Sequence, residues 1–403
     1  MNLLFIHPSS PGQFEFLSTF LANDSSHRVA FLCKTLYQKL PNNIIIKKYQ
    51  ANRDGIEPLR ACLIEAEAVF FAIKELENEN SFKPDIIVGH SGWGSLLYAR
   101  AACPTARIIG YFEWYYCMNP AFEGAWFLGR TDEEISVILT QRNAALLSQM
   151  ESCDGMFTPT RWQQSGFPTA YRQRIQVMHE GVDTDYFYPN KTNTDALAEI
   201  IPGISGKDEI VTMVSRGLEP TRCFPLFMDA VRKLLVKRPH CHVVIVGKEN
   251  TYYGSKPGNQ KSWKQQEIEK GGFDPARVHF TGWLTKDDYR SVLWASTVHV
   301  YLTLPFILSW SMLQAMSTGC CLVASDVQPV KEVVEEGVNG LLVDISSPDN
   351  IVSRIEEALS DKSLRERLAT QARKTILERY KLEDCLNKQI DFLEIRVRDK
   401  GFL

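Results

Sequence analysis

The chain has 403 residues, 44% hydrophobic and 23% charged, with a net charge of -3 and a pI near 6.3. This is the composition of a globular protein that is too long for one core, and it leaves no basic surface for nucleic acid. No apolar run reaches the ~20 residues that span a bilayer, and the start MNLLFIHPSSPG lacks the features of a signal peptide, so we predict a cytoplasmic, two-domain protein.

Short apolar strands alternate with longer polar helices up to about Met178. The predicted strands are Met1–Ile6, Val29–Cys33, Ile44–Lys47, Ile86–Val88, Arg107–Gly110 and Gly155–Thr158. The predicted helices are Gln13–Leu21, Glu57–Glu79, Gly94–Ala102 and Thr131–Glu151. This alternation predicts an α/β domain with a doubly wound parallel sheet, residues 1–180.

A turn-rich segment, HEGVDTDYFYPN, and the polar KTNTD after it predict a domain boundary. Within it, Asp183-Thr184-Asp185 has the DxD form with which some sugar transferases hold a metal ion. Its place in a turn beside Gly181 and Pro189 favours a turn-stabilising role instead. We therefore predict no metal site.

A second alternation predicts another parallel sheet over residues 190–380. Its predicted strands are Ile210–Ser215, His242–Val246, Val278–Thr281, Val298–Leu302, Cys320–Ala324 and Gly340–Val343, and helices are predicted at Phe224–Lys237, Ser262–Lys270, Lys286–Ala295 and from Asp349 onward. The last helix, Leu382–Val397, is amphipathic and far in sequence from the second sheet. Our hypothesis is that it crosses back onto the first domain, which would then include residues 382–403.

The stretch Tyr301–Asp326 has the pattern strand, polar turn, helix and buried strand. In a parallel sheet, ligands bind beyond the carboxyl ends of the strands, which here is the turn Pro305–Ser309. The helix after this turn is expected to direct free backbone N–H groups at that place, and these groups suit a phosphate.

Two arginines follow the first strand of the second sheet. Arg216 and Arg222 lie six positions apart around the turn that contains Gly217, and forked guanidinium groups bind diphosphates well. The alternative is a pair of solvated surface arginines, and the spacing alone does not decide between the two.

Other candidate residues also follow strands. His90 and Glu113 stand just past strands of the first domain, where either could orient a sugar hydroxyl or carry a proton. Gly247-Lys248 and Gly282-Trp283 occupy equivalent positions in the second domain. By local pattern alone these last two pairs are ordinary strand-ending turns.

In this order, five segments resemble a retaining glycosyltransferase of family 4 with the two-domain GT-B fold, of the bacterial exopolysaccharide type. They are HEGVDTDYFYP, VSRGLEPTR, FTGWLTKDDYRSVLWAS, VHVYLTLPFILSWSMLQAMSTGCCLVASD and VVEEGVNGLLVD. The likeness covers about Met178 to Tyr380. In the first domain it is limited to the Gly12 loop and the general alternation.

The resemblance implies a nucleotide-sugar donor held by the second domain, an acceptor held by the first, and transfer with retention and without a metal or cofactor. It implies that Arg216 and Arg222 neutralise the diphosphate, with Arg222 in place of a lysine. The histidine that the family often has after the relevant first-domain strand is absent, with Glu113 in its neighbourhood, and His90 and Glu113 are the predicted catalytic residues of the first domain. The implied donor-binding residues are Gly12, Gly217, Gly247, Lys248, Gly282, Trp283, Leu284, Phe306, Ile307, Leu308, Ser309 and Gln314.

Two departures from the family pattern concern the donor pocket. The family has two glutamates eight positions apart, and this chain has Phe306 and Gln314 there. Gln314 can still bond a ribose hydroxyl through its amide oxygen, whereas Phe306 supplies no carboxylate. We interpret PFILSWS as an alternative donor pocket.

UDP-glucose is the donor we predict first and a GDP sugar the second. The predicted acceptor is a glycan or a lipid-linked saccharide. We also predict weak peripheral contact with the inner face of the membrane. The alternatives are a nucleotide-sugar epimerase, a phosphorylase and a non-catalytic nucleotide-sugar binding protein. A dinucleotide dehydrogenase is disfavoured because no GxGxxG opens a helix after a strand.

Overall fold

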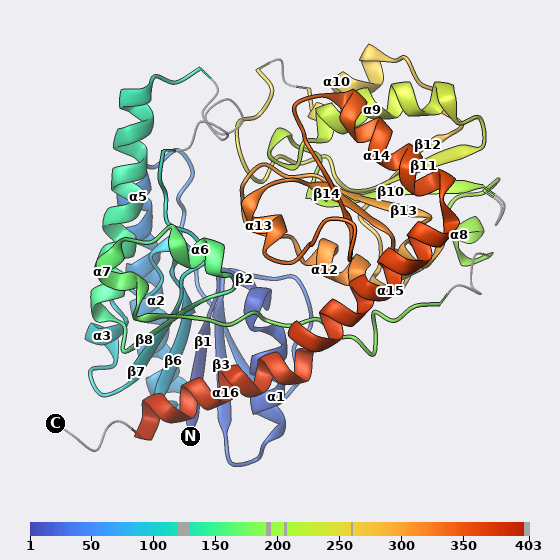
Figure 1. The fold of residues 1–403 in the computed structure, drawn as a ribbon. Coiled ribbons are helices and arrows are strands. Elements are labelled where there is room, and N and C mark those ends of the chain that lie inside the picture. The colour runs from blue at the N-terminus through green and yellow to red at the C-terminus, as the bar shows by residue number, and fades with distance from the viewer. Residues whose placement is uncertain (119–128, 191–194, 205–207, 259–260, 399–403) are drawn as a thin grey trace. The chain divides into compact units, whose positions relative to one another are not determined.

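The computed structural model of the protein describes residues 1–118, 129–190, 195–204, 208–258 and 261–398. The chain divides into two compact units (Figure 1). The first contains Met1–Met118, Thr131–Gly181 and the helix that begins at Leu382, and the second contains Val182–Lys381.

The first unit is built on a parallel sheet that has seven strands in the described part of the chain. Their spatial order is β5 (Ile44–Lys48), β3 (Arg28–Cys33), β1 (Asn2–Ile6), β6 (Ile86–His90), β7 (Arg107–Tyr111), β8 (Gly155–Thr158) and β9 (Ile175–Val177). The order reverses between β1 and β6, which are paired in parallel. A small separate sheet joins β2 (Ser9–Ser10) to β4 (Thr35–Leu36).

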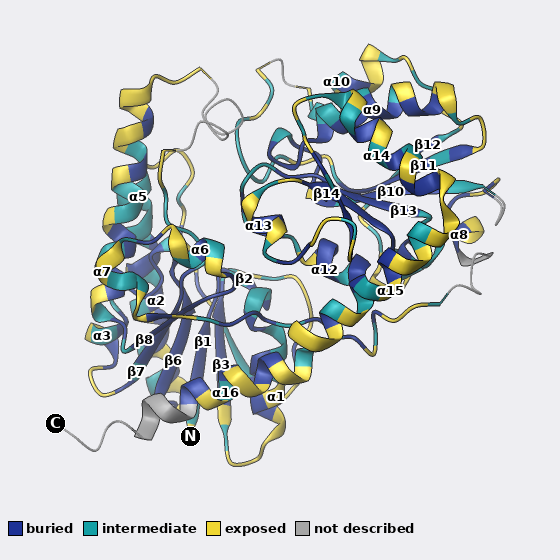
Figure 2. Ribbon diagram, in the orientation of Figure 1, coloured by how far each residue is buried: buried dark blue, intermediate teal, exposed yellow. Residues whose placement is uncertain are grey.

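Both faces of this sheet are buried, because successive side chains of a strand point to opposite faces. In β1, Leu4 and Ile6 belong to one apolar cluster, and Leu3 and Phe5 belong to another. Helices α2 (Pro58–Asn80), α3 (Ala99–Ala102) and α5 (Asp132–Ser152) cover the first cluster, and α1 (Glu15–Asn23) and α16 (Leu382–Arg398) cover the second. Figure 2 shows the resulting buried strands. The short helices are η1 (Gly12–Phe14), η2 (Ser91–Trp93), α6 (Arg161–Ser165) and α7 (Thr169–Arg172).

The second unit repeats this plan with six parallel strands among its described residues. Their order is β12 (Val278–Gly282), β11 (Cys241–Lys248), β10 (Glu209–Gly217), β13 (Val298–Tyr301), β14 (Leu322–Ser325) and β15 (Leu341–Val343), with the reversal between β10 and β13. Helices α9 (Phe224–Lys237) and α14 (Pro348–Ser360) pack with Val211 and Met213 on one face. The other face carries α8 (Asp195–Ile200), α11 (Lys286–Ala295), α12 (Trp310–Ser317) and α15 (Lys362–Arg379). The remaining helices are η3 (Pro220–Arg222), α10 (Trp263–Lys270) and α13 (Gln328–Lys331).

The two doubly wound units confirm the predicted GT-B class, and α16 packs on the first unit as expected. Its Leu386, Phe392 and Leu393 share an apolar cluster with Phe5. No helix in the described ranges is both long and apolar enough to cross a membrane.

One predicted helix is wrong in its first half. The helix expected at Gly94–Ala102 begins only at Ala99. Gly94 has φ +87°, and a Cβ there would lie 2.6 Å from the carbonyl oxygen of Cys62. A left-handed residue in contact with α2 forms a turn, because a right-handed helix cannot contain it. Strand β9 and helix α8 were not predicted, because both are short and lack a clear period.

Candidate functional site

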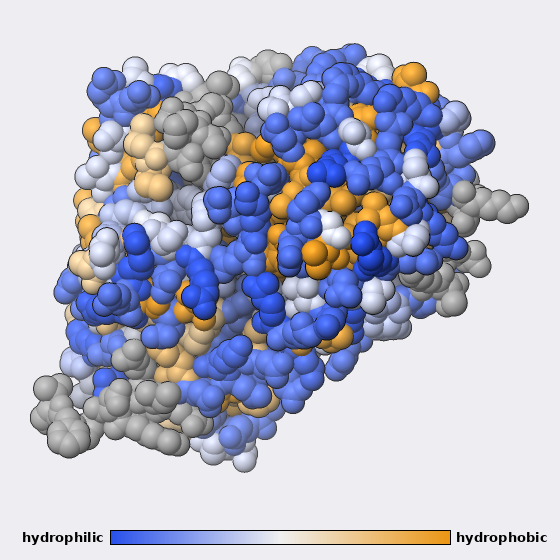
Figure 3. All heavy atoms as spheres, in the orientation of Figure 1, coloured by the Kyte–Doolittle hydropathy of each residue, from blue (hydrophilic) through white to orange (hydrophobic). Residues whose placement is uncertain are grey.

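The carboxyl edge of the second sheet is the candidate site of the second unit. In doubly wound sheets, ligands bind beyond the strand ends where the strand order reverses. Here the reversal lies between β10, which ends in Ser215-Arg216-Gly217, and β13, which ends at Tyr301. Helix η3, which ends at Arg222, follows β10 directly. On the face drawn in Figure 3, apolar residues gather in the part of this unit where α12 and α13 lie.

Arg222 is the charged centre of this edge. Its side chain is only 8% exposed, and its Nη1 donates to the hydroxyls of Tyr301 at 3.1 Å and Thr303 at 2.9 Å. Its guanidinium carbon lies 5.3 Å from the centre of the Phe306 ring. Among the described residues, no carboxylate forms an ion pair with it. Buried charges in proteins are normally paired. A guanidinium held only by hydroxyls and a ring is therefore suited to an anionic ligand.

Glu219, the acidic residue nearest to Arg222 in the sequence, forms hydrogen bonds with other groups. It is 1% exposed, and its Oε2 accepts from the backbone N–H groups of Tyr252 at 2.6 Å and Tyr253 at 3.1 Å. Its Oε1 accepts from the hydroxyl of Thr221 at 3.0 Å. Burial raises the pKa of Glu219, while these hydrogen bonds act in the opposite direction. Glu219 therefore fixes the loop after β11, a role that the sequence analysis missed.

Arg216 lies in a different environment. It is exposed, and its guanidinium carbon lies 4.1 Å from the centre of the Tyr252 ring, the same residue whose amide Glu219 holds. No described carboxylate pairs with Arg216 either. The turn also requires Gly217, because a Cβ there would lie 2.4 Å from the carbonyl oxygen of Asn250. Neither of the two predicted arginines thus forms an ion pair with a carboxylate in the described part of the chain.

The turn before α12 differs from the expectation of free amides. The amide of Ser309 donates to the Tyr301 hydroxyl at 2.9 Å, and the amides of Ser311 and Met312 donate to the side chain and carbonyl of Ser309. The Ser309 amide is thus not free in this structure, because a neighbouring hydroxyl binds it, and its role in donor binding stays a prediction. The amides of Ile307 and Leu308 have no hydrogen-bond partner in the described part of the chain. These two amides can therefore donate to a ligand.

The two positions that depart from the family pattern are both packed into the protein. Phe306 is 1% exposed, and its ring centre lies 4.9 Å from that of Tyr253. Gln314, in α12, accepts a hydrogen bond from the Tyr289 hydroxyl on its Oε1 at 2.9 Å. The amide oxygen expected to bind a ribose is therefore already engaged by one hydrogen bond. Its second lone pair and the NH₂ group have no partner among the described residues.

The ends of β11 and β12 bring another predicted pair together. The Lys248 Nζ lies 4.9 Å from the centre of the Trp283 ring, and Trp283 is 64% exposed. Leu284 packs partly against the apolar cluster under α8 and α11. An exposed indole beside a lysine at a strand end offers an aromatic face for stacking.

Two positions at this edge, Gly247 and Gly282, require glycine for different structural reasons. We therefore predict that substitution by alanine destabilises the protein to different extents at the two positions. At Gly247 a Cβ would lie 2.3 Å from the backbone oxygen of Ser215, whereas at Gly282 nothing lies within 4 Å but φ is +70°. Gly247→Ala should lower the free energy of unfolding by about 3 kcal/mol through overpacking. Gly282→Ala should lower it by about 1 kcal/mol through left-handed strain. Urea denaturation followed by tryptophan fluorescence measures both, and equal losses would contradict these reasons.

The first unit has its own reversal point, between β1 and β6, and two histidines stand there. His7 follows β1 and His90 ends β6, and their ring centres are 5.2 Å apart. The Nδ1 of His90 accepts from the amide of Gly92 at 3.0 Å, and that of His7 from the amide of Ser9 at 3.0 Å. Each neutral ring therefore carries its proton on Nε2.

Glu113, which follows β7, lies beside His90, a proximity that the sequence analysis did not predict. Its Oε2 is 3.4 Å from the His90 Nε2, and its Oε1 accepts from the Gln13 Nε2 at 2.8 Å. Its side chain is 18% exposed, whereas that of His90 is 3% exposed. The carboxylate thus accepts a hydrogen bond from Gln13, has the His90 ring nitrogen close by without a hydrogen bond to it, and still reaches solvent. This suits a group that binds a hydroxyl of a second substrate.

The sequence analysis missed a second histidine and glutamate pair at this edge. The His179 Nε2 lies 3.5 Å from Glu180 Oε2, and the Tyr111 hydroxyl donates to Glu180 Oε1. The Nδ1 of His179 accepts from the amide of Gly181 at 2.9 Å. The sequence contained a pattern that could have identified His179. His7, His90 and His179 are each followed two positions later by Gly or Ser.

Gly12 is explained by its contact with His7. It has φ +53°, and a Cβ there would lie 2.6 Å from the His7 Nε2. The loop therefore passes directly over the imidazole. Its predicted role in donor binding stays a prediction.

The DxD segment forms a turn. The Asp183 Oδ1 accepts from the amide of Tyr186 at 2.9 Å. The described residues contain no group of three or more His, Cys, Asp and Glu side chains that could hold a metal ion. The absence of a metal in function stays a prediction.

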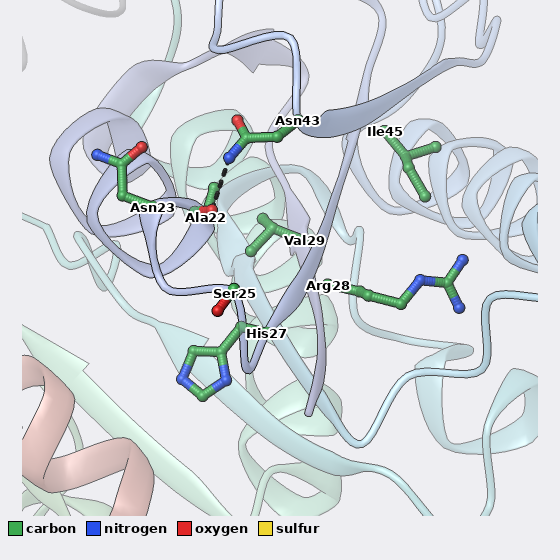
Figure 4. A pocket seen from close by; sticks show the side chains of 8 residues that line it. All are labelled: Ala22, Asn23, Ser25, His27, Arg28, Val29, Asn43 and Ile45. Atoms are coloured by element: carbon green, nitrogen blue, oxygen red, sulfur yellow. Dashed lines mark hydrogen bonds between the residues drawn. The ribbon is translucent and has the colours of Figure 1, made fainter.

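A cavity of about 320 Å³ lies at the opposite edge of the first sheet (Figure 4). It is lined by Ala22, Asn23, Ser25, His27, Arg28, Val29, Asn43 and Ile45. Because it adjoins the amino end of β3, it is distant from the strand ends that carry His7 and His90. We therefore place the candidate site at the carboxyl edges and not in this cavity.

Two family models match the chain. Residues 25–187 match the Glycosyl transferase family 4 group, and residues 197–375 match Glycosyl transferases group 1. Among solved structures, HepE from Anabaena in complex with UDP and glucose has a TM-score of 0.74 and 16% sequence identity, covering 98% of this chain and 99% of HepE. At this identity the likeness concerns the fold, which is the GT-B fold.

Curated relatives are similar over part of their length. D-inositol 3-phosphate glycosyltransferase of Nocardioides sp. is 26% identical over 210 residues, 49% of this chain and 44% of that protein. UDP-Gal:alpha-D-GlcNAc-diphosphoundecaprenol alpha-1,3-galactosyltransferase of Escherichia coli is 26% identical over 194 residues, 47% of this chain and 46% of that protein. The match thus spans less than half of each relative. Most of the first half of the chain is thus similar to the family 4 group of glycosyl transferases, and most of the second half to group 1.

Proposed function

We propose that this protein is a glycosyltransferase that transfers a sugar, with glucose favoured, from a nucleoside-diphosphate sugar to a glycan or lipid-linked acceptor with retention of configuration. The observation that carries the proposal is Arg222, which is nearly buried at the reversal point of the second sheet and has no described carboxylate partner. A diphosphate supplies the missing negative charge.

The proposed mechanism uses the charges of the second unit to stabilise the leaving group. Breaking the bond between sugar and diphosphate builds negative charge on the phosphate oxygens, and fixed cations aimed at that charge lower the barrier. Arg216 and Arg222 would supply this stabilisation without a metal ion. The acceptor hydroxyl attacks from the side of the departing phosphate, which takes the proton.

UDP-glucose is the donor we propose first, because the HepE structures were obtained with UDP, glucose and UDP-glucose. A lipid-linked acceptor is supported by the diphosphoundecaprenol-linked substrate in the name of the Escherichia coli relative. We propose a cytoplasmic enzyme that works at the inner face of the membrane. We propose that Glu113, with His90 behind it, binds the acceptor hydroxyl.

The test is a thermal-shift and turnover screen with nucleotide sugars. A ligand that binds only the folded protein stabilises it by about 2.7 kcal/mol at a hundredfold excess over its Kd, and this stabilisation raises the melting temperature. We expect UDP-glucose, or next a GDP sugar, to raise it, and release of the nucleoside diphosphate to require an acceptor.

The rival functions give other results in the same screen. A new sugar isomer formed from the donor alone would indicate an epimerase, and phosphorolysis of a glycan would indicate a phosphorylase. Binding without any transfer would indicate a non-catalytic binding protein, for which the buried Phe306 and the engaged oxygen of Gln314 are the motivating observations. No stabilisation by any nucleotide sugar would contradict the proposal.

A further inference from the structure

The hydroxyl of Tyr301 links the two segments that face each other across the reversal point of the second sheet. It accepts a hydrogen bond at 3.1 Å from the Nη1 of Arg222, the last residue of η3. It also accepts one at 2.9 Å from the amide of Ser309, the residue that caps the start of α12. Tyr301 itself ends β13 and is 2% exposed. One oxygen atom therefore holds both the arginine and the turn before α12.

The two accepted bonds determine where the proton of this hydroxyl points. A phenol has one O–H donor, and its oxygen accepts through lone pairs. Because Arg222 and Ser309 both donate to the oxygen, the hydrogen must point away from both. Within the described residues no atom accepts it. A buried donor without an acceptor is costly, so this arrangement calls for an acceptor supplied from outside the chain.

The surroundings define the chemistry of that acceptor. The Arg222 guanidinium bonded to the same oxygen has no described carboxylate partner. An oxygen that takes the Tyr301 proton therefore lies beside a positive charge that forms no ion pair with a described carboxylate. Phosphate oxygens combine negative charge with acceptor-only character. A sugar hydroxyl would satisfy the donor but not the charge.

We propose that the Tyr301 hydroxyl is a direct hydrogen-bond donor to a phosphate oxygen of the nucleoside-diphosphate donor. This inference rests on the proposed function. The phenol acts with Arg222 as one unit, since the guanidinium polarises the O–H that binds the same phosphate. The bond also connects occupancy of the phosphate site to the position of Ser309.

The experiment is calorimetric titration of the full chain with UDP, GDP and uridine. Tyr301→Phe should weaken the binding of UDP, or of GDP if that is the preferred base, by about tenfold or more, because a hydrogen bond to a charged group is lost. Uridine, which has no phosphate, should bind the variant as it binds the wild type. Tyr171→Phe removes the hydroxyl of a half-buried tyrosine of α7 in the first unit and should change neither affinity.

A double-mutant cycle separates direct contact from a role in holding Arg222. If Tyr301 donates to the ligand, adding Tyr301→Phe to Arg222→Ala should weaken UDP further. No further loss in that background, or unchanged UDP affinity in Tyr301→Phe alone, would overturn the inference while leaving the proposed function intact. If the wild type binds neither UDP nor GDP, both proposals fall.

A measurement on the wild type covers the case in which Tyr301→Phe does not fold. Crystals soaked with the nucleoside diphosphate that binds should show a phosphate oxygen within about 2.5–3.0 Å of Tyr301 Oη. A diphosphate bound with no phosphate oxygen in that range would overturn the inference.

Discussion

Replacing Arg222 by alanine should reduce turnover of the nucleotide sugar by about 10²–10³-fold, as does removal of one donor that stabilises a developing oxyanion. The physical reason is that Arg222 is a nearly buried cation with no described acidic partner, so its charge is available to the leaving phosphates. The effect should appear in release of the nucleoside diphosphate from the donor identified by the screen. The fold should survive, because among the described residues the Arg222 side chain bonds two hydroxyls, and each of these hydroxyls keeps another hydrogen-bond partner.

Two further variants sharpen this prediction. Arg222→Lys should retain more activity than Arg222→Ala, because a lysine keeps the point charge while losing the forked geometry. Arg60→Ala, which removes an exposed arginine from α2 in the first unit, should leave turnover unchanged. Near-normal rates in a folded Arg222→Ala protein would refute the assignment of this residue.

Glu113→Gln should lower the rate of sugar transfer by about 10²-fold while leaving the affinity for the nucleoside diphosphate within twofold of the wild type. The reason is that Glu113 is a carboxylate that Gln13 orients beside His90 in the first unit, whereas the predicted diphosphate contacts are all in the second. An amide keeps the size of the side chain but removes the negative charge that a hydroxyl proton would contact. Transfer to the acceptor found in the screen and calorimetric titration with the nucleoside diphosphate measure the two quantities.

The matched control is Glu151→Gln, which changes an exposed glutamate of α5 that bonds the Tyr171 hydroxyl. It should alter neither quantity. If Glu113→Gln weakened nucleotide binding as strongly as it slowed transfer, Glu113 would belong to the donor site and not to the acceptor site. Full transfer activity in Glu113→Gln would remove it from the mechanism.

The sequence predicted the parts of the site that depend on where strands end. Arg216 and Arg222 were found because they follow an apolar run, and His90 and Glu113 because they follow two others. Such positions are local features, since a parallel strand is a short apolar segment and its carboxyl end is the next few residues. The roles of these residues stay predictions that the variants above test.

The parts that were missed depend on partners far apart in the chain. Glu219 binds amides 33 and 34 positions away, and Arg222 meets Tyr301 79 positions away. The amide oxygen of Gln314 is engaged by Tyr289, and the Ser309 amide by Tyr301, so that both differ from the free groups that their local patterns suggested. None of these pairings follows from spacing in the sequence.

By itself, the sequence determined two doubly wound parallel sheets, the terminal amphipathic helix of the first unit and the strand ends at which ligands can bind, because hydrophobic periodicity is a property of short segments. Only the tertiary structure decided that Arg222 lacks a described carboxylate partner, that Gln13 orients Glu113 beside His90, and that the Tyr301 proton has no acceptor among the described residues. The physical reason is that the order of strands in a sheet, and not their order in the chain, brings one strand end beside another and so selects which polar groups are satisfied and which are left for a ligand.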